Sequence, residues 1–93
     1  MVFDQAKMIM KMKKAQKELA NEVIEIEAGG GAVTVRITGE QKIKKILIDP
    51  EQVDLEDIGE LERWLEQAVR DAIDKSQKLA AEKMKPLMGG LGL

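Results

Sequence analysis

The sequence predicts an α+β fold with the element order α-β-β-β-α, and three features of the 93-residue chain lead to it. Residues 3–21 are rich in Lys, Met, Ala, Gln and Glu and contain no Gly or Pro, which predicts a helix. Residues 24–48 alternate apolar and polar side chains between turns, which predicts strands. From residue 58 to about residue 84, apolar side chains recur every three or four positions, which predicts a second long helix. We therefore expect a three-stranded antiparallel meander and two long helices.

The first helix is amphipathic when its residues are placed at 100° intervals. Its apolar arc holds Met8, Ile9, Met12, Ala15, Leu19 and Ala20. The opposite arc holds Lys7, Lys11, Lys14, Lys17 and Glu18. Phe3 and Met10 project among the lysines, and an exposed apolar side chain there indicates a contact between subunits more than a surface for base stacking.

The three strands follow from side-chain parity. Alternation at period two places Ile24, Ile26 and Ala28 on one face of the first strand, and Val33, Val35 and Ile37 on one face of the second. Three consecutive glycines, 29–31, join them, because glycine enters positive φ without steric cost. In the third strand, residues 42–48, the parity slips at Lys44-Lys45, which predicts a β-bulge.

The ends of the last two elements carry recognisable signals. Asp49-Pro50 ends the third strand, because proline lacks the donor that a central ladder needs. Asp54 and Asp57 have a spacing typical of a capping box at the start of the second long helix. Pro86 is expected to stop that helix, which divides the chain into a domain over residues 1–86 and a flexible Gly/Leu-rich tail over residues 87–93.

Composition narrows the possible function. The chain has no His and no Cys, so the usual general base, thiol nucleophile and thiolate ligand are absent, and we expect no enzyme, no catalytic residue, no metal and no cofactor. Ser76 lies in the apolar seam of the second helix, where a packing role is expected. No apolar run approaches a membrane span, which favours a cytoplasmic protein without a membrane or a small-molecule substrate as partner. With one Phe, one Trp and no Tyr, the core is thin, and a homodimer is expected.

The charges are segregated along the chain, although the formal net charge is −2. Residues 1–17 carry five lysines against Asp4 alone, whereas residues 49–62 carry seven carboxylates and no base. The acidic run suits the positive end of a helix dipole, which is a simpler explanation for it than a metal site. An anionic polymer responds to the local field, so the basic end is a candidate for binding DNA.

Several short pieces of sequence stand in a particular order along nearly the whole chain. They are Lys17-Glu18-Leu19-Ala20, Ala28-Gly29-Gly30-Gly31 followed by Val33 and Val35, Ile46-x-Ile48-Asp49-Pro50, Ala68-Val69-x-Asp71-Ala72, and Glu82-Lys83-Met84 before a Gly/Leu-rich end. In this order the chain resembles the YbaB/EbfC family of bacterial nucleoid-associated proteins. Arg70 stands where the family commonly has Asn.

The resemblance implies a homodimer, intertwined or side by side, with projecting helical arms that grip duplex DNA with limited sequence preference. It also implies a place in the nucleoid, in chromosome organisation and gene regulation. The predicted DNA-binding residues are Lys7, Lys11, Lys13, Lys14 and Lys17, with a second set of Lys75, Lys78, Lys83 and Lys85 and a third of Arg36, Lys42, Lys44 and Lys45. The predicted dimer interface is the small-residue seam of Ile58, Leu61, Leu65, Ala68 and Ala72.

Two alternatives remain open. For each single lysine, a solvated helix face is as good an explanation as a phosphate contact. The whole chain could also be a protein-interaction module that uses its acidic surface and exposed apolar residues, with incidental DNA binding.

Overall fold

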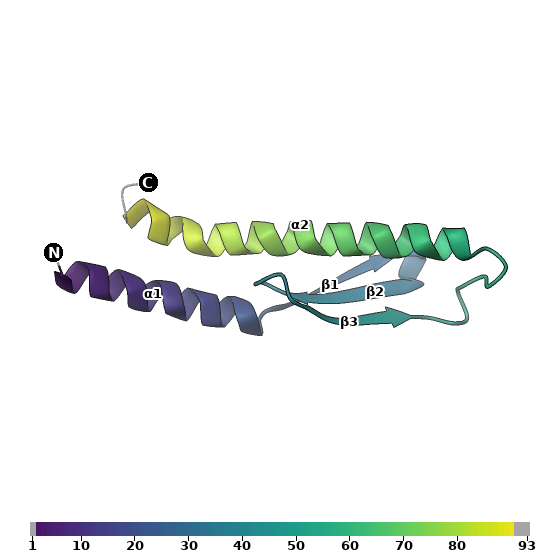
Figure 1. Cartoon of the computed structure of the whole chain (residues 1–93), viewed down its shortest axis with the longest axis horizontal. Coiled ribbons are helices and arrows are strands. Elements are labelled where there is room, and N and C mark those ends of the chain that lie inside the picture. Colours follow the sequence, from purple (N-terminus) through teal and green to yellow (C-terminus); the bar gives the residue numbers. More distant parts are fainter. Residues whose placement is uncertain (1, 91–93) are drawn as a thin grey trace.

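The chain folds into an elongated molecule in which one long helix spans nearly the full length (Figure 1). The computed structural model describes the backbone of residues 2–90 and the side chains of residues 4–87. Its elements are α1 (Val2–Asn21), β1 (Val23–Ala28), a 3-10 turn η1 (Gly29–Gly31), β2 (Val33–Thr38), β3 (Ile43–Ile48) and α2 (Ile58–Gly90). The principal extents are 64 × 21 × 14 Å. The α+β fold and its α-β-β-β-α order are therefore confirmed.

The three strands form an antiparallel sheet in the order β1-β2-β3. Register pairs Ala28 with Val33 and Ile26 with Val35, so the apolar parity read from the sequence places one apolar face on both strands. The connecting glycines 29, 30 and 31 have φ values of 63, 66 and 97°. These are left-handed conformations that a side chain would strain, so the triple glycine makes the hairpin as expected.

The bulge predicted in β3 is present. Arg36 pairs with Lys45 while Ile37 pairs with Ile43, so Lys44 is the extra residue. The bulge brings Ile43 to the same face as the isoleucines further along the strand. Asp49 then follows the strand, and its carboxylate accepts hydrogen bonds from the Gln52 side chain and the Glu51 amide, which lower the pKa of Asp49.

Helix α2 covers the apolar face of β1 and β2 (Figure 1). Val33, Val35 and Ile37 of β2 pack against Ala68 and Ala72, and all five are completely buried. A helix about 10 Å wide covers roughly two strands spaced about 4.8 Å apart. The third strand, β3, therefore lies beyond the cover that α2 provides.

The two ends of α2 differ from expectation. Asp57, rather than Asp54, caps the helix, since its Oδ1 accepts from the Glu60 amide at 3.2 Å. The prediction that Pro86 stops the helix is wrong, because α2 continues to Gly90 with Pro86 inside it. Proline removes one intrahelical bond, and one turn of α2 before it the ion pairs of Lys83 with Glu18 and Glu22 tie the helix to the end of α1. The expected flexible tail lies partly in this helix and partly, from residue 91, outside the described residues.

Candidate nucleic-acid interface

Helix α1 and residues 83–87 of α2 lie side by side and form what we call the arm (Figure 1). The arm joins the sheet through the C-terminal half of α1, where Ala15 and Leu19 are buried. The Gly39 amide donates to the Leu19 carbonyl at 2.9 Å, and a Cβ at Gly39 would lie 2.7 Å from Leu19 Cδ2. Glycine at this turn therefore permits the close approach that seats α1 against the sheet.

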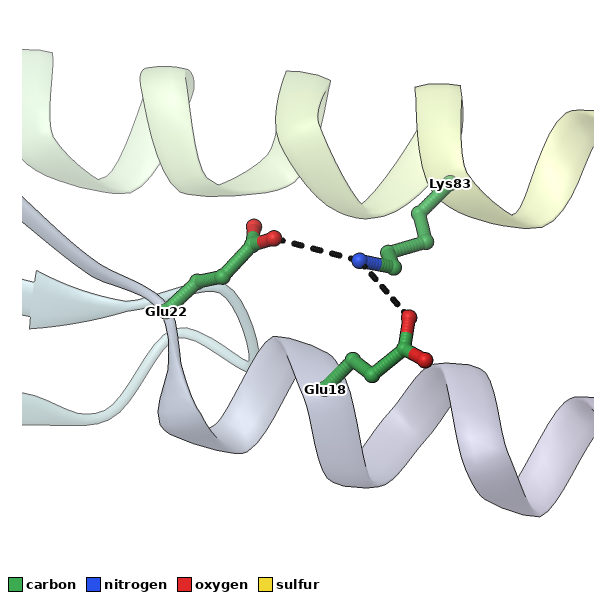
Figure 2. A network of polar contacts seen from close by, with 3 residues as sticks. All are labelled: Glu18, Glu22 and Lys83. Carbon is green, nitrogen blue, oxygen red and sulfur yellow. Dashed lines mark hydrogen bonds and ion pairs between the residues drawn. The ribbon is translucent and has the colours of Figure 1, made fainter.

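One ion-pair network links the two helices of the arm. Figure 2 shows Lys83 of α2 reaching toward the C-terminal end of α1, where its Nζ lies 2.9 Å from Oε2 of Glu18 in that helix and 3.1 Å from Oε1 of Glu22, just beyond it. The hydrogen bond and the charge of Lys83 lower the pKa of Glu18, and the hydrogen bonds to Glu18 and Glu22 raise the pKa of Lys83. The sequence placed Lys83 among the DNA-binding lysines, whereas its ammonium is occupied by two carboxylates within the chain.

The five lysines of α1 are all exposed, and two of them line a hollow. Lys11 and Lys14 face α2 across a hollow of about 230 Å³, which we call the arm hollow. Lys13 and Lys17 are exposed and do not line it. The lysine arc therefore does not lie opposite the apolar arc as a whole, and Ile9, which was assigned to the apolar arc, is 53% exposed.

The lysines of α2 are also divided between two places. Lys75 and Lys78 line a second hollow of about 260 Å³, together with Ile24 of β1, Leu79 and Glu82. Lys85 is exposed. On the sheet, Arg36 pairs with Glu25 at 2.9 Å, which neutralises the arginine of the third predicted set.

Seven of the 17 acidic residues fall within residues 49–62, at the other end of the molecule from the arm. The segment between β3 and α2, residues 49–57, forms the connection at the end opposite both the start of α1 and the end of α2 (Figure 1). Within it Leu55 is 78% exposed. The charge asymmetry of the sequence thus becomes a spatial separation between a basic arm and an acidic loop.

The predicted interface seam on α2 is largely covered by the chain's own sheet. Ala68 and Ala72 have no exposed surface, and Leu61 and Leu65 pack against the same core. Ile58 is 46% exposed. The buried alanines explain the small-residue spacing, because they let α2 approach β2 closely.

The sequence analysis did not predict the exposed apolar surface on β3. Ile43, Ile46 and Ile48 are 42, 43 and 46% exposed, although their register places them on the core-facing side of the sheet. The exposure of these isoleucines could have been predicted from the number of strands, because one helix is too narrow to cover a three-stranded sheet.

The packing role predicted for Ser76 is only part of what this residue does. Its Oγ donates to the Thr38 carbonyl at 2.6 Å and accepts from the Gln41 amide at 3.1 Å. The side chain of Gln41, whose φ is 64°, donates to the same oxygen. Ser76 therefore fastens the β2–β3 turn to α2 and does more than save space.

Within residues 2–90, no group of three or more acidic side chains is arranged to hold a metal ion. None of the helices described is long and apolar enough to cross a membrane.

Comparison with known proteins identifies the family. A model of the YbaB/EbfC DNA-binding family matches residues 1–91. The chain belongs to this family. YbaB/EbfC relatives named nucleoid-associated protein include one from Chloroflexus aurantiacus, 48% identical over 80 residues, which are 86% of this chain and 80% of the relative. Another, from Ruminiclostridium cellulolyticum, is 43% identical over 86 residues, covering 92% and 75% of the two chains.

The YbaB/EbfC fold also has a solved counterpart. The crystal structure of the uncharacterized protein HP0035 from Helicobacter pylori superposes with a TM-score of 0.72 at 22% identity, covering 94% of this chain and 87% of that one. At this identity the likeness establishes the shared fold. Membership of YbaB/EbfC makes the chain part of a nucleoid-associated DNA-binding family rather than of a family of enzymes.

Proposed function

We propose that the protein binds duplex DNA as a homodimer, mainly through phosphate contacts of its arm, with limited sequence specificity. In this role it contributes to chromosome organisation and gene regulation in the nucleoid. The observation that carries the proposal is the separation of charge: exposed lysines on the arm and carboxylates on the loop at the far end. The cytoplasm is the corresponding location.

The chemistry of the arm favours backbone contacts over base reading. Its basic side chains are all lysines, which are mobile point charges without the planar fork of arginine. Direct reading of bases in the major groove relies on geometrically fixed donors and acceptors. We therefore expect similar affinities for unrelated duplexes and a strong dependence on salt.

The homodimer rests on the uncovered face of β3. Each of its three isoleucines is nearly half exposed, and burying the rest of one such side chain contributes about 1 kcal/mol. Two copies would bury six of them, about 6 kcal/mol before the costs of association. A second copy at this face would complete the cover that α2 leaves unfinished, and would pair two arms in one particle.

A salt titration tests the DNA-binding proposal. Binding to several unrelated duplexes is measured for the wild type and for a variant with Lys7, Lys11 and Lys14 changed to Ala. The logarithmic salt slope falls by about 0.9 for each phosphate that the protein no longer neutralises, so the variant is expected to bind more weakly with a flatter slope. Unchanged binding and slope would remove the arm from the proposal.

A matched pair of substitutions on β3 tests the dimer. Ile46→Gln alters the uncovered face, whereas Lys45→Gln changes the adjacent exposed residue on the other face. Because a symmetric interface contains the position twice, Ile46→Gln is expected to weaken association by about 2 kcal/mol, or roughly thirtyfold. Sedimentation equilibrium measures this, and equal dissociation constants for both variants and the wild type would contradict this interface.

The exposed Leu55 within the acidic loop favours a second candidate function. In that case the protein is an interaction module whose acidic surface and exposed Met10 and Leu55 dock another protein. Phe3, assigned to the same role, lies outside the residues whose side chains are described. A mobility-shift assay at physiological salt separates the two functions, since an absence of any shift at micromolar protein rejects the DNA proposal.

A further inference from the structure

The arm hollow lies between α1 and α2, near the end of the molecule that carries the basic residues. Its lining comes from both helices: Lys11, Lys14, Ala15 and Glu18 of α1, and Lys83, Pro86 and Leu87 of α2. At about 30 Å³ per water molecule, a volume of about 230 Å³ has room for several waters. A phosphate group with part of its sugar is of that size.

The lysines around the hollow differ in whether a carboxylate of the chain already pairs with them. Lys83 is held by Glu18 and Glu22, so its charge is compensated within the chain. Among the described residues, Lys11 and Lys14 form no ion pair, although Lys14 is close enough to Glu18 to help lower the pKa of that carboxyl. Glu18 and Glu22 share the one ammonium of Lys83, so this network carries a net charge of −1. Together with Lys11 and Lys14 the hollow therefore has a net charge of +1, and its unpaired ammonium groups are those of Lys11 and Lys14, on one wall.

The other lining residues are apolar. Ala15 is buried at the base of the α1 wall, and Pro86 and Leu87 contribute carbon surface from α2. An apolar surface beside a cation lowers the local dielectric response, which strengthens the attraction to an anion. A deoxyribose presents carbon-bound hydrogens next to its phosphate, so the pair of lysines and the apolar wall match the two parts of a sugar-phosphate unit.

We propose that the arm hollow seats a backbone phosphate of DNA with its sugar, so that the strand docks at the mouth between α1 and α2 and not along the outer face of α1. This inference rests on the proposed DNA binding and assigns a location to it. Lys11 and Lys14 contact the phosphate, and Leu87 contacts the sugar. Lys13 and Lys17 contribute to the general positive field.

Two double substitutions on the same helix test the assignment at equal charge. Lys11→Gln with Lys14→Gln removes the hollow lysines, and Lys13→Gln with Lys17→Gln removes two lysines from outside the hollow. We expect the first variant to lose about tenfold or more in affinity and to flatten the salt slope by about 1 to 2, since each phosphate left without its lysine accounts for about 0.9. The second is expected to change affinity less than about threefold, with little change in slope.

The outcomes separate the location from the function. Equal losses for both variants, or a larger loss for the outer pair, overturn the hollow while leaving DNA binding in place. No binding by the wild-type protein overturns the proposed function itself. All four lysines are exposed, and circular dichroism before each titration confirms that the variants are folded.

A cross-linking experiment locates the strand independently of affinity. The chain contains no cysteine, so a single introduced thiol is the one reactive sulfhydryl. Leu87→Cys places it in the hollow, and Ala81→Cys places it at an exposed position of α2 outside the hollow. With a duplex carrying a thiol-reactive group on its backbone phosphorothioates, we expect cross-links at position 87 and not at 81, and the reverse pattern would overturn the proposal.

Discussion

Ser76 offers the most direct test of how the turn and the long helix are joined. Ser76→Ala removes the donor to the buried Thr38 carbonyl at 2.6 Å and the acceptor that Gln41 uses twice. In the variant the Gln41 amide still donates to the Thr38 carbonyl at 3.1 Å, and the exposed Gln41 side chain can turn to water. Most of the lost stability therefore comes from the Ser76 hydrogen bond to the Thr38 carbonyl. Such a loss costs about 1 to 2 kcal/mol, offset by about 0.5 kcal/mol of better helix propensity for alanine.

The net destabilisation of about 1 kcal/mol corresponds to a fall in the unfolding midpoint of about 4 to 8 °C for a domain of this size. Thermal unfolding followed by circular dichroism at one chain concentration measures it, because association makes the midpoint depend on concentration. Gln77→Ala, at the next and exposed position of α2, supplies the control and is expected to leave the midpoint unchanged or slightly raised. A Ser76→Ala midpoint equal to that of the control would refute the assigned role.

The remaining predictions concern the glycine turn and the arm. Gly29→Ala is expected to lower the free energy of unfolding by about 3 kcal/mol, because the new Cβ would lie under 3.0 Å from the Trp64 ring at a φ of 63°. Gly30→Ala places its Cβ in open space at a φ of 66° and is expected to lower it by about 1 kcal/mol. Chemical denaturation of the two variants compares these losses. The stability contributed by the Lys83 pairs is expected to be present above pH 4.5, the usual pKa of Glu18, and to be lost as the pH falls through the lowered pKa of Glu18 in the folded protein. It is likewise present below pH 10.5, the usual pKa of Lys83, and is lost as the pH rises through the raised pKa of Lys83 in the folded protein. The difference in unfolding midpoint between the wild type and Lys83→Met should therefore shrink at both extremes of pH, and a pH-independent difference would contradict the pairing.

The strands and their turns could be predicted from the sequence because the relevant physics is local. Alternation at period two, the slip at Lys44 and the need for positive φ at three glycines each constrain the backbone within a few residues. The resemblance to YbaB/EbfC proteins, now supported by the family match, joined these local features into one order.

The features that the sequence analysis predicted wrongly, or did not predict, depend on contacts between segments that are distant in the sequence. Pro86 lies inside a helix that Lys83, three residues before it, ties to the end of α1, and Lys83 is occupied because Glu18 and Glu22 face it across 61 to 65 positions of sequence. A helical projection of α1 alone could not reveal which flank of its lysine arc faces α2. The exposed isoleucine face of β3 likewise follows from the width of the sheet relative to one helix.

The separation of charge explains how a chain of net charge −2 can have a surface suited to a polyanion. At physiological ionic strength the Debye length is about 8 Å, and the molecule is 64 Å long with its acidic loop at the end away from the tip of the arm. Carboxylates at that distance contribute almost nothing to the potential at Lys11 and Lys14. Nearer to the hollow, Glu18, which lines it, and Glu22 share the single ammonium of Lys83 through direct ion pairs. Lys83 cancels one of these two negative charges, so Lys11 and Lys14 remain unpaired and leave the hollow a net charge of +1 that attracts a phosphate.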